Sequence, residues 1–190
     1  MKNILISGAP SVGKSTVITH LEGKIPQKDC LVTRDQARWY MEKNNLRADT
    51  MTVEQKNEMQ HFVIATYIGA MIHSQKTNIM GILDGSLIEA RNYSDGVVRD
   101  EILRIVKAQL HHYKEHSIAY IIPPTIPLVN DGLRHASNNF RIEMHEKIVQ
   151  TIVEHKIPYH FIVSEGPKNR ANEILAYHEH YMPTSSRAHV

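Results

Sequence analysis

The sequence predicts an α/β fold in which helices cover both faces of a parallel β-sheet, with ligands expected at the carboxyl ends of the strands. Two observations predict it. Five short apolar runs are separated by longer stretches whose apolar residues recur at helical spacing. In addition, a Gly-x-x-x-x-Gly-Lys-Ser pattern directly follows the first run, and this pattern is a phosphate-binding loop when it lies between a strand and a helix.

Strands and helices are expected to alternate along the chain. Strands are predicted in apolar runs of strand length, namely KNILIS (2–7), CLVT (30–33), IMGILD (79–84), IAYII (118–122) and YHFIV (159–163). Helices are predicted from residue 14 onward and over three longer stretches, 54–75, 94–113 and 139–155. The apolar stripes of these three helices should face the core: Met59, Phe62, Val63, Thr66 and Ala70; Val98, Ile102, Ile105, Val106 and Leu110; Phe140, Met144, Ile148 and Ile152.

The loop after the first strand predicts nucleotide binding. Its glycines let the backbone fold over a phosphate, so that successive N–H groups and the start of the next helix point at negative charge. Lys14 would reach the β- and γ-phosphates of ATP, and the Ser15 hydroxyl would bind Mg²⁺. We therefore assign nucleotide binding to nine loop residues, Gly8, Ala9, Pro10, Ser11, Val12, Gly13, Lys14, Ser15 and Thr16.

Polar and aromatic residues follow the second strand, in the segment RDQARWY. Asp35 either caps the first turn of a helix or touches the hydroxyl of an acceptor, which makes it a candidate catalytic residue. Arg38 lies one helical turn further on and would face the same crevice. Arg34 and Trp39 complete the candidate acceptor site, where Trp39 either packs against the protein or stacks on a base.

Asp84 ends the third strand, where a carboxylate beside a phosphate loop usually organises Mg²⁺ or its water. The Asp-Gly pair that it forms with Gly85 is also a strong turn signal, and the two interpretations are compatible. Asp84 is thus a candidate metal ligand together with Ser15, and it is a second candidate for the catalytic base. Glu89 is close enough in sequence to reach the same site, but it is expected on the solvated face of a helix.

A long connection, residues 123–141, follows the fourth strand and is rich in Pro, Asn and Gly. Connections this long and irregular are often lids over an active site. An arginine on a closing segment can neutralise charge on a transferring phosphoryl group. We therefore assign Arg134 to catalysis and Arg141 to nucleotide binding. The alternative is a surface loop that simply contains two arginines.

Length and composition place bounds on the molecule. The 190 residues suit one domain, expected over residues 1–180, with residues 181–190 as a flexible tail. Lys and Arg number 22 against 20 acidic residues, so net charge gives no argument for nucleic-acid binding. Cys30 is the only cysteine, which excludes an intrachain disulfide and favours the cytoplasm. The sequence has no run of the roughly 18 apolar residues that a membrane helix needs, so no membrane partner is expected.

Together these segments resemble the AAA-type P-loop kinases that include the ribosylnicotinamide kinase domain. The resemblance is carried by GAPSVGKST, DQAR, ILDGSLIEARNYS and, most specifically, PPTIPLVNDGLRHASNNFR with its Asp-Gly-x-Arg. It continues through IPYHFIVSEGPKNRANEIL and covers about residues 2–177. It implies a P-loop NTPase fold of the nucleoside and nucleotide kinase kind, with five parallel strands in the order 2-3-1-4-5 and a lid. It also implies that Arg170 contacts the nucleotide.

Two departures from this family leave the acceptor open. Asp35 stands where the family has glutamate, and the segment DGS after the third strand stands where many relatives have Asp-Arg or Asp-Thr. TRDQAR also resembles the Arg-Asp-x-x-Arg segment of phage polynucleotide kinases, in which the aspartate activates an acceptor hydroxyl. Small phage P-loop kinases that phosphorylate hydroxymethyluracil within DNA are of the same general kind.

The sequence therefore favours an ATP-dependent kinase that transfers the γ-phosphoryl group to a hydroxyl of a nucleoside or nucleotide, with ATP and Mg²⁺ as cofactors. One alternative is a kinase acting on a nucleotide hydroxyl inside nucleic acid, either hydroxymethyluracil in phage DNA or a polynucleotide 5′ end. Another is an ATP-binding regulatory module without turnover. For a phage-encoded kinase the expected location is the host cytoplasm. Lys14, Asp35, Asp84 and Arg134 would carry the catalysis, with either Asp35 or Asp84 as the base.

Overall fold

Five parallel strands form one sheet in the order β2-β3-β1-β4-β5, as seen in a computed structural model that describes residues 2–94, 100–126 and 137–180. The strands are β1 (Asn3–Ser7), β2 (Cys30–Thr33), β3 (Met80–Asp84), β4 (Ser117–Ile121) and β5 (Tyr159–Phe161). The α/β class, all five strands and their order are therefore confirmed. The order reverses beside β1, because the chain goes from β1 to one side of the sheet and later returns to the other. Ligands bind at such a switch point in open α/β sheets.

The strand registers align the carboxyl ends of the three central strands at one edge of the sheet. Ile6 of β1 lies opposite Asp84 of β3 and opposite Tyr120 of β4. The carboxyl ends of the three central strands therefore lie side by side. All residues of these three strands are buried, which explains why they read as continuous apolar runs rather than as alternating ones.

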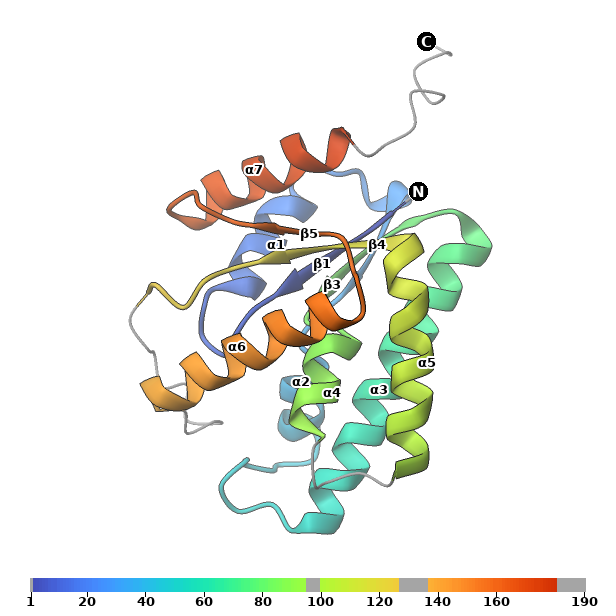
Figure 1. Cartoon of the computed structure of the whole chain (residues 1–190), viewed down its shortest axis with the longest axis vertical. Coiled ribbons are helices and arrows are strands. Elements are labelled where there is room, and N and C mark those ends of the chain that lie inside the picture. Colours follow the sequence, from blue (N-terminus) through green and yellow to red (C-terminus); the bar gives the residue numbers. More distant parts are fainter. Residues whose placement is uncertain (1, 95–99, 127–136, 181–190) are drawn as a thin grey trace.

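Helices cover both faces of the sheet (Figure 1). They are α1 (Lys14–Glu22), α2 (Gln36–Lys43), α3 (Val53–Thr77), α4 (Leu87–Tyr93), α5 (Asp100–His116), α6 (Asn138–Glu154) and α7 (Pro167–Glu179), with a 3₁₀ turn, η1, at Gln27–Asp29. On one face α1 and α7 pack on side chains of the central strands, among them Ile4, Ile82 and Tyr120. On the other face α2 to α6 share a core that includes Leu5 and Leu83.

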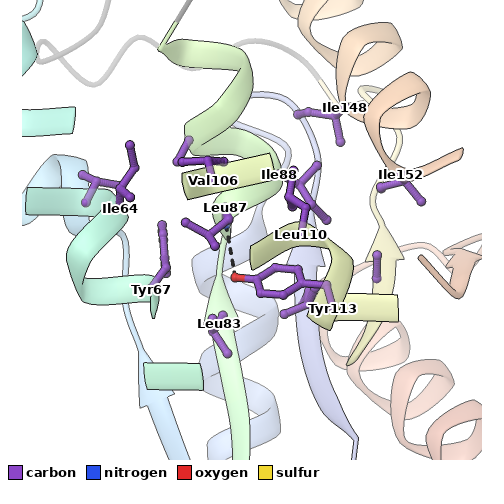
Figure 2. Packing of buried hydrophobic residues seen from close by; sticks show 14 of the residues in the cluster. Ile64, Tyr67, Leu83, Leu87, Ile88, Val106, Leu110, Tyr113, Ile148 and Ile152 are labelled. Carbon is purple, nitrogen blue, oxygen red and sulfur yellow. Dashed lines mark hydrogen bonds between the residues drawn. The ribbon is translucent and has the colours of Figure 1, made fainter. Parts of the chain in front are cut away.

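The short helix α4 lies inside the larger of these two cores. It packs against α3, α5 and α6. Figure 2 shows Tyr113 of α5 reaching the first turn of α4, where its hydroxyl accepts a hydrogen bond from the backbone N–H of Leu87 at 3.3 Å. Because Tyr113 satisfies one of the N–H groups that a helix start leaves without an internal partner, this buried helix end costs little. The position of α4 matters because it follows directly on Asp84.

The expected helical stretches correspond to α3, α5 and α6, and most of their stripe residues are buried or half-buried. The stripes are wrong at two positions: Ile105 is 48% exposed and Phe140 is 37% exposed. The expected connection over 123–141 also differs at its end, because Ser137 caps a helix that begins at Asn138. Val98, Arg134 and the tail 181–190 lie outside the described residues.

Candidate active site

The phosphate loop connects β1 to α1 and depends on two glycines. Gly8 has φ +148°, and a Cβ atom there would lie 2.6 Å from the carbonyl oxygen of Ile122. Gly13 has φ +88° and is the residue from which α1 begins. Only glycine adopts such a conformation without strain, so the spacing of the two glycines follows from the geometry of the loop. The loop therefore wraps the start of α1, where backbone N–H groups attract anions.

Lys14 folds back over this loop. Its Nζ donates hydrogen bonds to the carbonyl oxygens of Gly8 at 2.8 Å and Ala9 at 2.9 Å. Both bonds are between a charged donor and neutral acceptors. A phosphate in the loop would offer the ammonium group an anionic acceptor, and such charge-assisted bonds are roughly twice as strong. The position of Lys14 thus fits the phosphate-binding role that the motif predicts.

Asp84 and Ser15 meet at the end of β3. Asp84 is 3% exposed, and its Oδ2 accepts a hydrogen bond from Ser15 Oγ at 2.5 Å. The backbone oxygen of Asp84 accepts a second bond from the hydroxyl of Tyr67 at 2.7 Å, which anchors the turn from α3. A carboxylate beside a hydroxyl is a pair of hard oxygen donors, the kind that Mg²⁺ prefers. The residues present therefore fit the expected magnesium site.

Glu89 is a site residue that the sequence analysis missed. It was expected on a solvated surface, but it is 6% exposed on α4. Its Oε1 accepts a hydrogen bond from the backbone N–H of Gly8 at 3.2 Å, and its Oε2 accepts one from Ser86 Oγ at 2.9 Å. Burial raises the pKa of the Glu89 carboxyl, while the nearby Lys14 ammonium and these hydrogen bonds oppose the rise. Glu89 thus connects α4 to the first residue of the phosphate loop.

Asp35 has the capping role that the sequence suggests, and its contact with an acceptor stays a prediction. It caps α2, and its Oδ1 accepts a hydrogen bond from the backbone N–H of Arg38 at 3.0 Å. Arg38 Nε also lies 4.0 Å from Asp35 Oδ2. At the same time Asp35 lines both cavities described below, together with Lys14 and Asp84. A cap uses one carboxylate oxygen, so the same side chain can face a ligand.

Two other residues of the segment RDQARWY lie outside the two cavities. Arg34 forms an ion pair with Glu22 and packs on α1, where its Nη1 donates hydrogen bonds to Thr19 Oγ1 at 3.2 Å and to the backbone oxygen of the loop residue Ser15 at 3.4 Å. Trp39 is 46% exposed and stacks on Phe62, with 5.2 Å between ring centroids and 14° between ring planes. Neither residue is among those that line the two cavities. Trp39 thus adopts the packing role, and binding by Arg34 or Trp39 stays a prediction.

Two buried arginines contact the backbone of the phosphate loop, and neither lines the two cavities described below. Arg141, in the first turn of α6, donates from Nε to the carbonyl oxygen of Pro10 at 3.2 Å. Arg170, in α7, donates from Nη1 to the carbonyl oxygen of Val12 at 3.1 Å. Both arginines therefore lie beside the phosphate loop and bond its backbone. Direct binding of the nucleotide by either of them stays a prediction. The third predicted arginine, Arg134, lies outside the described residues.

Two cavities meet at this site. The first, which we call the phosphate-loop cavity, is lined by Ser11, Gly13, Lys14, Ser15, Thr16, Asp35, Arg38 and Asp84. The second, which we call the apolar cavity, has a volume of about 240 Å³ and lies between the loop, α2, α3, α4 and α6. Its lining comprises Pro10, Lys14, Asp35, Ala37, Met41, Ala48, Met59, Gln60, Val63, Tyr67, Asp84, Gly85, Glu89, Ala90, Tyr93 and Phe140. Lys14, Asp35 and Asp84 line both.

The fold is shared with several solved structures. A NadR protein in complex with NR superposes with a TM-score of 0.68 at 21% identity, over 100% of this chain and 54% of that one. A NadR protein in complex with NAD and AMP-PNP gives 0.65 at 17% identity, over 100% and 52%. Deoxyadenosine kinase from M. mycoides with bound dCTP gives 0.51 at 13% identity, over 95% and 100%. At these identities the likeness is one of fold, and the chain spans about half the length of the two NadR chains.

Comparison of the sequence itself gives the family. No curated protein matches the sequence significantly. None of the described helices is long and apolar enough to cross a membrane. A family model described as an AAA domain matches residues 3–170, from the first residue of β1 to Arg170 of α7. This match includes the phosphate loop, both candidate carboxylates and both arginines that contact the loop, and the chain therefore belongs to this AAA domain family.

Proposed function

We propose that this protein is an ATP-dependent kinase that transfers the γ-phosphoryl group to a hydroxyl of a free, unphosphorylated nucleoside. One observation carries the proposal: the phosphate-loop cavity and the apolar cavity share Lys14, Asp35 and Asp84. A donor whose phosphates lie in the first cavity and an acceptor that lies in the second would meet at these three side chains. Phosphoryl transfer depends mainly on such positioning and on charge neutralisation.

The donor side uses the loop and the Ser15–Asp84 pair. Backbone N–H groups of the loop and the start of α1 would hold the phosphates, and Lys14 would exchange its two carbonyl acceptors for phosphate oxygens. Ser15 and Asp84 would hold Mg²⁺, which supplies charge neutralisation at the phosphates. Arg38 lines the same cavity and would face the phosphates from the α2 side.

On the acceptor side we assign the base to Asp35. The acceptor hydroxyl oxygen forms a bond to the γ-phosphorus, the bond from that phosphorus to the β–γ bridging oxygen breaks, and ADP leaves with the electron pair. The hydroxyl proton passes to the Asp35 carboxylate. Asp84 is the weaker candidate for this step because its Oδ2 is engaged with Ser15 at 2.5 Å. Asp35 lies at the start of α2, where Oδ1 accepts the capping bond and Oδ2 lies 4.0 Å from Arg38 Nε, a much longer contact than the 2.5 Å bond at Asp84.

The composition of the apolar cavity favours a neutral acceptor. Among the described residues that line it, Lys14 is the only basic one, and Lys14 is needed for the donor phosphates. A nucleotide acceptor would bring a further phosphate that needs further cations. The cavity volume of about 240 Å³ lies just below the roughly 300–1,000 Å³ typical of ligand pockets, which suits one small molecule. Gln60, which is 6% exposed, offers amide groups to a polar ring.

The test is ADP release measured with a panel of acceptors. The panel comprises free nucleosides, nucleoside monophosphates, and oligonucleotides that include DNA with hydroxymethyluracil. We expect turnover with at least one free nucleoside and none with the oligonucleotides. Asp35→Asn should lower this turnover by about 10²–10⁴-fold while leaving ATP affinity within about twofold, because a base acts after binding. Asp29→Asn, which changes an exposed carboxylate outside both cavities, is the matched control.

Three outcomes would contradict the proposal. Turnover only with monophosphates would show that the acceptor site holds a phosphate. Turnover only with DNA, weakened steeply by salt, would make the protein a nucleic-acid kinase, since phosphate contacts release counterions. ATP binding without ADP release for any acceptor would make it a nucleotide-binding module without turnover.

A further inference from the structure

Arg141 and Arg170 form the same kind of bridge on two sides of the phosphate loop. Arg141 joins the carbonyl oxygen of Pro10 to that of Ile126, the latter through Nη2 at 3.1 Å. Arg170 joins the carbonyl oxygen of Val12 to that of Ser164, the latter through Nε at 3.1 Å. Each guanidinium thus ties the loop to a segment that follows a strand, β4 in one case and β5 in the other.

Both guanidinium groups are buried, which makes their bonds costly to lose. Arg141 is 2% exposed and Arg170 is 6% exposed. Among the described residues neither of them forms an ion pair with a carboxylate, and the acceptors of their hydrogen bonds are backbone and amide oxygens. A buried cation whose partners are neutral is stabilised when an anion binds nearby. The arrangement is therefore suited to a site that receives phosphates.

The carbonyl contacts determine which way the loop amides point. In a trans peptide unit the C=O of one residue and the N–H of the next point in opposite directions. The described peptide bonds are all trans. Holding the Pro10 carbonyl oxygen behind the loop therefore directs the N–H of Ser11 to the front. Holding the Val12 carbonyl oxygen does the same for the N–H of Gly13.

The front of the loop is the side at the phosphate-loop cavity, which would receive the nucleotide and which neither Arg141 nor Arg170 lines. Ser11 and Gly13 line the phosphate-loop cavity, while Val12 is buried and does not. A flipped peptide unit would present a carbonyl oxygen to the phosphates instead of an N–H, and this would replace attraction by repulsion. We infer that Arg141 and Arg170 are positioning residues that act on the nucleotide through the loop, by holding the peptide units 10–11 and 12–13 with their N–H groups toward the phosphates.

This inference rests on the proposed nucleotide binding, and it differs from direct contact with the nucleotide. An arginine that neutralises the transferring phosphoryl group would favour ATP over ADP. An arginine that orients loop amides affects phosphates that ATP and ADP have in common. A lysine would keep the charge but, with a single nitrogen, would not span two carbonyl oxygens as the planar guanidinium does.

The experiment compares two substitutions at each arginine. Arg141→Lys and Arg170→Lys keep the charge, while Arg141→Gln and Arg170→Gln keep a donor without the charge. Arg47→Lys, at an exposed arginine paired with Asp49, is the matched control. Dissociation constants are measured by calorimetry for Mg²⁺ with ADP and for Mg²⁺ with AMP-PNP. Hydrogen exchange of loop peptides that contain Ser11 and Gly13 is followed without ligand, and melting curves identify any variant that is not folded.

We expect both kinds of variant to weaken ADP and AMP-PNP by the same factor, about tenfold, the loss typical of a hydrogen bond to a charged group. Exchange at the loop amides should be faster, and the control should match wild type. The inference is overturned if AMP-PNP weakens while ADP does not, since the guanidinium then contacts the γ-phosphate directly. It is also overturned if the lysine variants bind both nucleotides as wild type does, since the positive charge alone would then be sufficient. The same holds if no variant changes nucleotide affinity or loop exchange.

These outcomes are distinguishable from failure of the proposed function. Wild-type protein that binds neither ADP nor AMP-PNP would refute nucleotide binding. In that case the hydrogen-exchange measurement still reports on the arginines, because it needs no ligand and compares each variant with wild type at the same loop peptides. A lysine variant that does not fold is replaced by the glutamine variant of the same residue.

Discussion

Gly8→Ala is expected to be among the most destabilising single-methyl additions in this protein. The added Cβ would lie 2.6 Å from the carbonyl oxygen of Ile122 and 3.1 Å from a methyl group of Val12. Neither neighbour moves easily, because Ile122 continues β4 and its N–H is bonded to the oxygen of Ser7 at 2.9 Å. The backbone at Gly8 also has φ +148°, a conformation that L-residues rarely adopt.

The size of the effect follows from these two terms. Backbone strain of this kind costs about 1–3 kcal/mol, and the steric overlap with a fixed backbone atom adds about 1–3 kcal/mol. We therefore expect a loss of about 4 kcal/mol in the free energy of unfolding. For a chain of this size each kcal/mol corresponds to roughly 2–4 °C, so the melting temperature should fall by about 12 °C.

Two other glycines serve as matched controls. Gly13 has φ +88°, but the nearest atoms to an added Cβ would be 3.8 Å away. Gly13→Ala should therefore lower the free energy of unfolding only through backbone strain, by about 1–2 kcal/mol. Gly69 lies inside α3 with no atom within 4 Å of its Cβ position, so Gly69→Ala should stabilise the protein by up to about 1 kcal/mol.

The assay is urea unfolding followed by circular dichroism, with thermal melts in parallel. The expected order of midpoints is Gly69→Ala above wild type, then Gly13→Ala, then Gly8→Ala, with the slope of the transition unchanged. A midpoint for Gly8→Ala equal to or above that of Gly13→Ala would refute the reasoning. The close approach of the loop to the end of β4 would then not be what requires glycine at this position.

The remaining predictions concern the polar side chains of the site. Lys14→Met should lower kcat/KM by about 10²–10³-fold through loss of charge at the phosphates, as seen in steady-state kinetics. Asp35→Asn should lower the single-turnover rate by about 10²–10⁴-fold with ATP affinity retained, whereas Asp84→Asn should raise the Mg²⁺ concentration needed for half-maximal rate by about 10–100-fold. The opposite pattern would exchange the roles of the two carboxylates. Burial raises the pKa of the Glu89 carboxyl in the folded protein. Protonated Glu89 therefore contributes fully to the free energy of unfolding below the pKa of the unfolded chain, near 4.3, and this contribution is lost as the pH rises through the folded pKa. Urea unfolding should therefore show wild type losing stability relative to Glu89→Gln as pH rises above about 4.3, and parallel pH curves would contradict this.

The local pattern of the sequence was sufficient for the elements that build the sheet. Each strand is an apolar run whose length matches a strand, and each long helix carries a stripe at helical spacing. Asp84 was found in the same way, because the end of a parallel strand beside a phosphate loop is a position with a known chemical use. These inferences needed only residues close together in the chain.

The errors came from contacts between distant segments. Glu89 looked like a surface residue because a short helix with Glu, Arg and Asn carries no apolar stripe, and only packing between α3, α5 and α6 buries it. Ile105 and Phe140 fit helical stripes and are nevertheless exposed, because a neighbouring element decides how wide the covered face of a helix is. One signal in the sequence could have revealed this. Glu89 follows Ser86 by three positions at the turn from β3 to α4, and this spacing could have suggested that the two side chains form a buried pair.

The sequence by itself determined the class of fold, the position of the phosphate loop and the residues most suited to phosphate, metal and acceptor. It did so because glycine conformation, apolar periodicity and strand ends are properties of short segments. Only the tertiary structure decided that Lys14, Asp35 and Asp84 border two cavities at once. It also decided that Arg141 and Arg170 contact loop residues 131 and 158 positions away. The physical reason is that a buried polar group must find its partner wherever packing places one, and no local pattern records that place.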